Sequence, residues 1–156
     1  MKNTIIRAIG RLQESWQKEA IHMYTTRLDR FGGIEVVELP EGHGKSAKPD
    51  PQKGMKVEGE SLLKGIPEDA TIIALDSRGK TLDSKAFSTH IQTWTQKGHL
   101  VFLIGGSWGI DPEVLQKADF TLSFGPMTFP HGIARLMLIE QIYRARMIEA
   151  GSEYHK

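Results

Sequence analysis

Short apolar stretches that alternate with longer amphipathic ones are the feature of this chain that most restricts its fold. The stretches of strand character are residues 4–9, 34–39, 71–75, 100–104 and 120–124. The helical stretches cover residues 15–30, 57–63, 83–97, a segment that begins at Asp111, and residues 133–150. Strands alternating with helices favour an α/β fold with a mainly parallel sheet flanked by helices. Since the 156 residues contain no internal repeat and no linker, residues 1–156 are expected to form a single domain.

Local signals mark several of these boundaries. Ser15 is a candidate N-cap, and Asp83 opens the third helix in the same way. Asp111 and Pro112 combine a capping carboxylate with a proline at the first helical position. Residues 41–56 are rich in glycine, lysine and proline and poor in apolar residues, so we expect a mobile surface loop there.

The composition excludes several classes of protein. The chain has no cysteine, which excludes disulfides, thiolate metal ligands and a cysteine nucleophile and fits a cytoplasmic location. No stretch approaches the roughly 18 apolar residues of a membrane span. The spacing of the histidines does not suggest a metal site. The formal net charge is +1, so an RNA partner has to be argued from features other than a strongly basic composition.

Gly105, Gly106 and Gly109 follow the wholly apolar strand at residues 100–104. In parallel sheets, ligands bind outside the carboxyl ends of the strands, and glycines let the backbone approach a ligand closely. The spacing differs from the G-x-G-x-x-G pattern of dinucleotide-binding proteins. The motif alone leaves a ligand site and a tight structural turn as equal alternatives.

Residues 124–132 form a second unusual segment. Two prolines and two glycines in nine residues exclude regular structure, yet the segment carries Phe124, Met127 and Phe129. An apolar irregular loop after a strand either packs into the core or lines a pocket. In a pocket its free backbone groups could recognise an adenine edge. The residues by themselves slightly favour simple packing.

The last predicted helix and the tail that follows carry the remaining signals. Apolar residues spread around most of the circumference of the helix, so it must be covered on more than one side. This favours a homodimer, with a central helix in a monomer as the alternative. In the tail, Tyr154 and His155 could act in acid–base chemistry, unless the tail is simply frayed. The arginines at positions 135, 144 and 146 could bind phosphate, although Glu140 competes for Arg144 as a helical ion pair.

Five segments, in this order along the chain, resemble the ribosomal large-subunit pseudouridine methyltransferase H family, a minimal branch of the SPOUT superfamily. They are LDSRGK at residues 75–80, FLIGGS at 102–107, LSFGPMTFPH at 122–131, IEQIYRA at 139–145 and YHK at 154–156. The resemblance covers the whole chain and is closest from Thr71 onward. It implies a C-terminal deep trefoil knot of the SPOUT type, a homodimer, and no metal or membrane association.

The resemblance also implies S-adenosylmethionine as the cofactor and N3 of a pseudouridine in the 23S rRNA of assembled ribosomes as the methyl acceptor. The implied cofactor-binding residues are Leu75, Gly105, Phe124, Gly125, Pro126, Met127, Thr128 and Phe129. The chemistry of such a reaction makes Tyr154, His155 and Arg144 the candidate catalytic residues, and Arg135, Arg144 and His131 the candidate RNA-binding residues.

Three other functions compete with this reading. The first is a SPOUT methyltransferase with a different RNA target, such as a tRNA, against which the tail and the absence of an added RNA-binding domain argue. The second is a non-enzymatic dimer that binds the cofactor or the ribosome. A nicotinamide-dependent oxidoreductase is disfavoured by the glycine spacing. One departure from the family pattern is Trp108, which could narrow the cofactor pocket or pack beneath it.

Overall fold

A five-stranded sheet forms the centre of the protein in a computed structural model that describes residues 3–156. The strands are β1 (Thr4–Ile9), β2 (Glu35–Leu39), β3 (Thr71–Thr81), β4 (Leu100–Ile104) and β5 (Phe120–Ser123). Their order across the sheet is β2-β1-β4-β3-β5, and every neighbouring pair is parallel. The α/β fold with a parallel sheet that the alternating pattern predicts is therefore confirmed.

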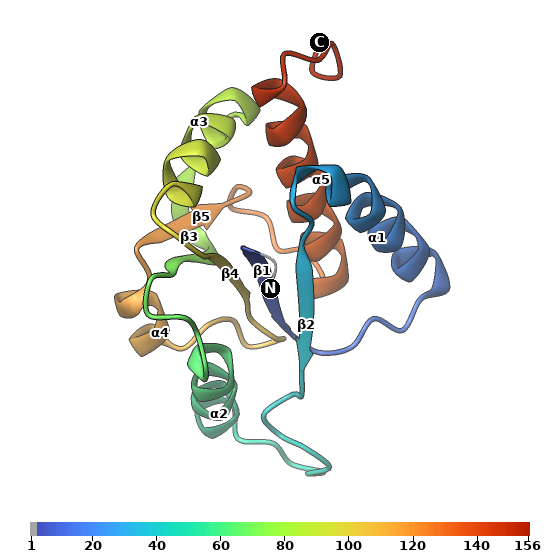
Figure 1. Cartoon of the computed structure of the whole chain (residues 1–156). Coiled ribbons are helices and arrows are strands. Elements are labelled where there is room, and N and C mark those ends of the chain that lie inside the picture. The colour runs from blue at the N-terminus through green and yellow to red at the C-terminus, as the bar shows by residue number, and fades with distance from the viewer. Residues whose placement is uncertain (1–2) are drawn as a thin grey trace.

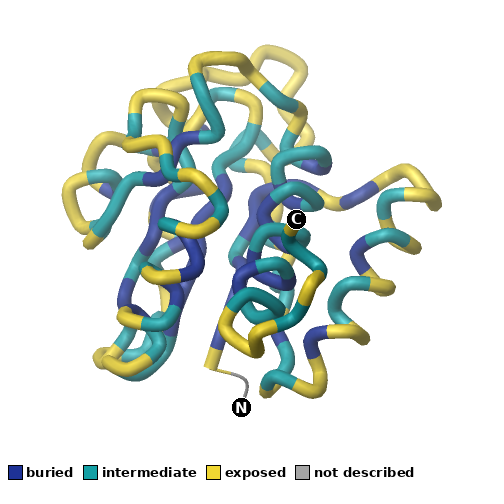
Figure 2. The backbone as a smooth tube through the Cα atoms, turned by 90° about the horizontal axis from the view of Figure 1, so that it is seen from above, coloured by how far each residue is buried: buried dark blue, intermediate teal, exposed yellow. Residues whose placement is uncertain are grey.

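Helices cover both faces of the sheet (Figure 1). They are α1 (Ser15–Leu28), a short 3-10 turn η1 (Asp29–Phe31), α2 (Pro51–Leu63), α3 (Ser84–Thr95), α4 (Pro112–Lys117) and α5 (His131–Glu149). Successive side chains of a strand point to opposite faces, and in β4 both sets are buried: Phe102 packs in one core cluster and Leu103 in the other. Figure 2 shows the buried residues along the strands in the middle of the molecule. Burial on both faces is the reason that β4 has no polar residue.

Helix α2 begins earlier than the sequence analysis expects. Residues 51–56 belong to α2 rather than to the surface loop, so that prediction is wrong for them. The Asp50 carboxylate accepts hydrogen bonds from the backbone N–H groups of Gln52 and Lys53 at 3.0 and 3.5 Å, and Pro51 occupies the first turn. Asp50-Pro51 is thus the same start signal as Asp111-Pro112. The lysines and glycines around it obscured that signal.

The predicted caps of the other helices fare differently. Asp83 caps α3 by accepting from the N–H of Ala86 at 2.7 Å. Ser15 is the first residue of α1 and not its cap; the N-cap is Glu14, whose side chain makes no capping hydrogen bond. The prediction that Ser15 caps α1 is therefore wrong, although the helix starts where it was expected.

Strand β3 extends past Leu75 through an irregularity. Leu75 and Lys80 both pair with Leu122 of β5, so residues 76–79 bulge out between two paired stretches. A Cβ on Gly79 would come within 2.5 Å of the Thr121 carbonyl oxygen, and this close approach requires glycine. The knot implied by the family resemblance remains a prediction.

Helix α5 packs against both α1 and α3 on one face of the sheet. Its buried residues include Leu138, Ile139 and Ile142. Packing against α1 and α3 therefore covers much of the apolar surface of α5 within one subunit. The first residue of α5, His131, lies beside Gly10 at the carboxyl end of β1. In the last turn of α5, Met147 contacts Arg30, which lies a few residues before β2 begins. The helix consequently carries the C-terminal tail to the amino ends of the strands (Figure 1).

Candidate cofactor site and tail site

The carboxyl ends of β3, β4 and β5 bring three chain segments together. Ala74 pairs with Leu103, and the next residue, Leu75, pairs with Leu122. Leu75 is therefore level with the end of β4, where Gly105 follows, and with the end of β5, where Phe124 follows. The predicted cofactor residues thus meet at one edge of the sheet, as ligand-binding loops do in parallel α/β proteins.

The segment after β5 is held at its base and open at its tip. The Ser123 hydroxyl donates to the carbonyl oxygen of Ser77 at 3.0 Å and accepts from the N–H of Gly125 at 2.9 Å. Gly125 has φ = 107°, a conformation that favours glycine. Met127 is 74% exposed, so the loop does not pack into the core as a whole.

The same segment leaves backbone groups available to a ligand. Among the described residues, no hydrogen bond engages the backbone of Met127, Thr128 or Phe129. Phe124 and Phe129 are half-buried at either end of this stretch. Free amide and carbonyl groups beside half-buried rings suit a ligand that has an aromatic base with a polar edge.

The glycine turn after β4 has a structural requirement of its own. Gly109 N–H donates to the Gly106 carbonyl at 3.0 Å, and a Cβ on Gly105 would come within 2.7 Å of the Gly109 carbonyl oxygen. A tight turn alone is therefore sufficient reason for glycine at position 105. The turn is half-exposed at the edge where the other two segments end, and the ligand site stays a prediction beside this structural role.

A buried carboxylate, which the sequence analysis missed, supports this turn from the side of α2. Glu58 is only 2% exposed; its Oε1 accepts from the N–H of Gly42 at 3.0 Å. The carboxylate also lies against Gly106, where a Cβ would come within 3.0 Å of Oε1 and 3.1 Å of Oε2. Burial raises the pKa of Glu58, although the backbone N–H groups of Gly42 and Gly106 favour the charged form. The available signal was Gly54, Glu58 and Leu62 at four-residue spacing on one face of α2.

Trp108, which belongs to the glycine turn, packs against α2. A Cβ on Gly54 would overlap the indole ring of Trp108, so the close approach of helix and ring requires glycine at position 54. The His43 ring meets the indole edge-on, with ring centroids 5.6 Å apart. Both roles expected of Trp108 at the cofactor pocket stay predictions.

Arg135 is fully buried, which contradicts the expectation that it binds RNA. Its Nη1 donates to Glu38 Oε2 at 2.8 Å and its Nη2 to the Gly10 carbonyl oxygen at 3.0 Å. Burial raises the pKa of Glu38, but hydrogen bonds from Arg135 and from the Leu12 N–H outweigh that effect and hold it below its usual value. Arg135 therefore joins α5 to the carboxyl ends of β1 and β2.

His131, the other predicted RNA-binding residue outside the tail, is half-buried beside Gly10. Burial lowers the pKa of His131, and the positive charge of Arg135 lowers it further. A neutral imidazole contributes little to phosphate binding. Arg144 is the one of the three predicted RNA-binding residues that lies partly exposed with its guanidinium near the surface.

The tail folds back onto α5 instead of fraying. The Tyr154 hydroxyl lies 3.2 Å from Glu140 Oε1, and its ring packs edge-on against Tyr143. Arg144 forms an ion pair with Glu140 at 2.7 Å and lies over the Tyr154 ring, 4.8 Å from its centroid. Arg144 Nη1 also lies 3.2 Å from His155 Nδ1. The three predicted catalytic residues are therefore in mutual contact.

The state of these side chains limits what they can do. Burial and hydrogen bonding with Tyr24 raise the pKa of Tyr154 to about 12, so its phenol stays protonated near neutral pH. Arginine only donates hydrogen bonds, so His155 Nδ1 accepts and the ring proton lies on Nε2. In this arrangement the tail offers donors, and Nδ1 becomes a base only after it separates from Arg144.

The tail lies against the second half of α5, whereas the cofactor segments lie near the start of that helix. Nine residues of α5, about 14 Å at 1.5 Å per residue, separate His131 from Glu140, the residue that Tyr154 contacts. The structure thus brings the predicted site residues together in two groups rather than one.

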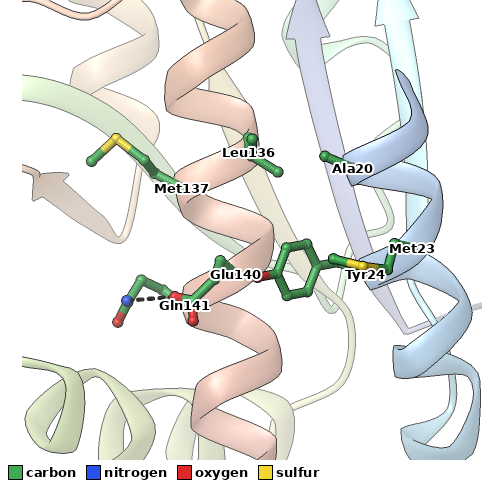
Figure 3. A pocket seen from close by; sticks show the side chains of 7 residues that line it. All are labelled: Ala20, Met23, Tyr24, Leu136, Met137, Glu140 and Gln141. Atoms are coloured by element: carbon green, nitrogen blue, oxygen red, sulfur yellow. Dashed lines mark hydrogen bonds between the residues drawn. The ribbon is translucent and has the colours of Figure 1, made fainter. Parts of the chain in front are cut away.

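Figure 3 shows a groove between α1 and α5, and one of its lining residues, Glu140, contacts Tyr154 of the tail. The groove has a volume of about 450 Å³, and it is lined by Ala20, Met23, Tyr24, Leu136, Met137, Glu140 and Gln141. Within residues 3–156, no group of three or more histidine, aspartate or glutamate side chains could hold a metal ion. No helix in that range is long and apolar enough to cross a membrane.

Comparison with known proteins gives concordant results. Residues 1–155 match a family described as "Predicted SPOUT methyltransferase". Proteins named ribosomal RNA large subunit methyltransferase H are similar over the full length of both chains, with 42% identity in Carboxydothermus hydrogenoformans, 41% in Bifidobacterium adolescentis and 38% in Acetivibrio thermocellus. A probable methylase family protein from Haemophilus influenzae has the same fold, with a TM-score of 0.56 and 13% identity over 99% of this chain and 71% of that one.

Proposed function

This chain belongs to the SPOUT methyltransferase family, and from that membership we propose that it transfers a methyl group from S-adenosylmethionine to N3 of a pseudouridine in large-subunit ribosomal RNA. The observation that carries the proposal is the similarity, over the full length of both chains, to proteins named ribosomal RNA large subunit methyltransferase H. Such a substrate implies action in the cytoplasm on assembled ribosomes. The proposed methyl transfer is also supported by the fold, because Leu75, Gly105 and residues 124–129 meet at the carboxyl ends of β3, β4 and β5.

Leu75, Gly105 and residues 124–129 would hold the cofactor. The unengaged backbone groups of Met127, Thr128 and Phe129 fit the polar edge of an adenine, and the half-buried phenylalanines fit its ring. When bound, the sulfonium supplies an electrophilic methyl carbon, so the protein's task is mainly to align donor and acceptor.

The tail residues would manage the proton on N3 of the base. His155 is the candidate acceptor of this proton once its Nδ1 is released from Arg144. Tyr154, which stays protonated, would donate a hydrogen bond to a carbonyl oxygen of the base. Arg144, partly exposed beside both, would contact phosphate or stabilise the ionised imide.

A homodimer resolves the separation of the two groups of residues. The tail of one subunit, held against the second half of α5 and away from its own cofactor segments, would act at the cofactor segments of the second subunit. The groove between α1 and α5 and its exposed neighbours Trp16 (50% exposed) and Met23 (41%) offer an apolar face for this contact.

Methyl transfer to separated substrates tests this function. Labelled S-adenosylmethionine is incubated with the protein and with assembled ribosomes, isolated large subunits or naked ribosomal RNA from a strain that lacks the modification. We expect label in the large-subunit RNA of assembled ribosomes, because the small net charge predicts weak binding to naked RNA. Bound cofactor with no label in any substrate would favour the non-enzymatic binding protein, and label in tRNA alone would favour a different RNA target.

A further inference from the structure

A cluster of lysines lies on one segment of the chain. Residues 42–57 contain lysines 45, 48, 53 and 56 and a single acidic residue, Asp50, whereas the whole chain has a formal net charge of +1. The remainder of the chain is therefore net acidic, and the positive charge is concentrated here. We propose that this lysine segment, residues 43–56, is a surface that binds the phosphate backbone of the RNA substrate; the inference rests on the function proposed above.

The four ammonium groups are available to a partner. Each lysine is exposed, and among the residues that the structure describes none of the four takes part in an ion pair. Lys53 and Lys56 are three residues apart on α2, so they share a side of that helix. Lys45 and Lys48 lie on the loop that leads into it.

Two of the acidic groups nearby are engaged in local contacts, one is buried, and Glu60, one turn beyond Lys56 on α2, is exposed. Glu41 Oε2 lies 2.6 Å from His43 Nε2, and the Asp50 carboxylate caps α2. Glu58 is buried, and burial raises its pKa toward the neutral form. None of these carboxylates pairs with one of the four lysines, so the segment presents mainly positive charge to solvent.

The lysine segment is attached directly to the candidate cofactor site. Gly54 lies against the Trp108 ring, the His43 ring meets that indole at 5.6 Å, and Glu58 lies against Gly106. The first two contacts join the segment to the glycine turn that carries Gly105, and Glu58 joins the next turn of α2 to it. Figure 1 shows α2 and the loop before it at the end of the molecule opposite the C-terminus. An RNA backbone bound here would pass beside the cofactor segments.

The chemistry of the segment favours nucleic acid over a protein partner. Besides its prolines, the lysine segment contains only two apolar side chains, Ala47 and Met55, and Met55 is half-buried. Protein interfaces are depleted in lysine at their centres and enriched in aromatic residues. Lysine supplies a compact, sequence-independent charge that suits backbone phosphate, and specificity would come from the site beside it.

A charge-removal experiment tests the proposal on the full chain. The variant K45Q/K48Q/K53Q/K56Q is compared with the matched control K64Q/K85Q/K97Q/K117Q, which removes four exposed lysines from other surfaces. Binding to assembled ribosomes that lack the modification is measured by sedimentation between about 50 and 200 mM salt, and S-adenosylmethionine affinity is measured by calorimetry.

We expect the segment variant to bind ribosomes at least tenfold more weakly at about 0.1 M salt and to lose about 3 from the slope of log K against log[salt]. The segment variant should bind S-adenosylmethionine with the affinity of the wild type. The control variant should match the wild type in ribosome affinity, in salt slope and in cofactor affinity. Equal ribosome affinity and slope in both variants would overturn the proposal, as would a loss of affinity with an unchanged slope, which would indicate a protein contact.

This readout separates the two proposals. If the wild type methylates ribosomes and the segment variant still binds them with wild-type affinity, only the proposal that the lysine segment binds RNA is refuted. A wild-type protein that binds ribosomes through the segment but transfers no methyl group would refute the proposed function alone.

Discussion

Individual side chains with altered protonation are the part of this protein most sensitive to pH. Glu58 and Tyr154 both have raised pKa values, and burial is the largest cause in each case. Glu58 supports the glycine turn, whereas Tyr154 belongs to the tail. Substitutions at these positions should therefore affect different properties, the first stability and the second catalysis.

Replacing Glu58 tests the buried carboxyl. The folded protein holds this proton more tightly than the unfolded chain, so Glu58 lowers the free energy of unfolding as pH rises above about 4.5 until its raised pKa is passed. E58Q should remove this pH dependence and be at least as stable as wild type near pH 7. E58A should be about 1–3 kcal/mol less stable, because the Gly42 N–H loses its acceptor. Urea unfolding from pH 4.5 to 8 measures both; an E58Q curve that still falls with pH would assign the titration to another group.

The tail residues should differ in their effect on catalysis. H155Q should reduce kcat by about 10²–10⁴-fold, because the candidate proton acceptor is lost. Y154F should lower kcat less and keep its pH profile unchanged between about pH 6 and 9, because the wild-type phenol titrates only at about 12. E153Q, at an exposed neighbour in the tail, is the matched control. A Y154F enzyme whose profile loses a limb in that range would show that the tyrosine ionises during turnover.

At the scale of helices and strands, the sequence ends β3 at Leu75 whereas the strand runs to Thr81, but it predicts the other four strands and the starts of α3 and α4 correctly. It does so because the two-sided burial of a parallel sheet leaves continuous apolar runs such as the one in β4. The start of α2 is missed because its inner face is built largely from Gly54, Glu58 and Gly59. These residues are buried through contacts with Trp108, Gly106 and Val114, which are distant in sequence. The burial of Arg135 is missed for the same reason, since its acceptors lie on β2 and after β1.

The contact of α2 with the glycine turn can be tested by a double-mutant cycle. G54A should destabilise the protein by about 1–3 kcal/mol, because the added methyl group overlaps the Trp108 ring. In a W108A background the same change should be neutral or stabilising, since alanine is favoured over glycine in a helix by about 0.5–1 kcal/mol. Additive effects of the two substitutions in urea unfolding would exclude the contact.

The link between α5 and the ends of β1 and β2 depends on Arg135. R135M should cost about 3 kcal/mol of stability, because Glu38 and the Gly10 carbonyl lose their donor. Since the guanidinium is buried, ribosome affinity at a temperature where the variant is folded should remain that of the wild type. Weaker ribosome binding by a protein of unchanged stability would restore the original assignment of Arg135 to RNA contact.

At the scale of the whole molecule, the catalytic site is proposed to be shared between two subunits. The sequence indicated both groups of residues but could not show that one lies near the start of α5 and the other against its second half. That separation depends on the direction of the helix relative to the sheet. The dimer and the knot are both predictions at this scale, and the dimer is the one on which catalysis depends.

Mixed dimers test the sharing of the site. H155Q removes the tail function, and G125V disables the cofactor segment, where φ = 107° disfavours a branched residue. A mixed dimer of the two variants retains one complete site only if tail and segment come from different subunits. Random mixing should then restore about a quarter of wild-type activity, since about half of the dimers are mixed and each has one active site. No recovery after confirmed subunit exchange would place the tail and the cofactor segment of one subunit in the same site.

The central claim, methylation of a pseudouridine at N3, is tested most directly by identifying the methylated nucleoside. Ribosomes treated with the protein and labelled S-adenosylmethionine are digested, and the RNA fragments and nucleosides are analysed by mass spectrometry. The account predicts a single labelled nucleoside from the large-subunit RNA, with the fragmentation pattern of a pseudouridine methylated at N3. Label on a different base, on a ribose or on small-subunit RNA would contradict it.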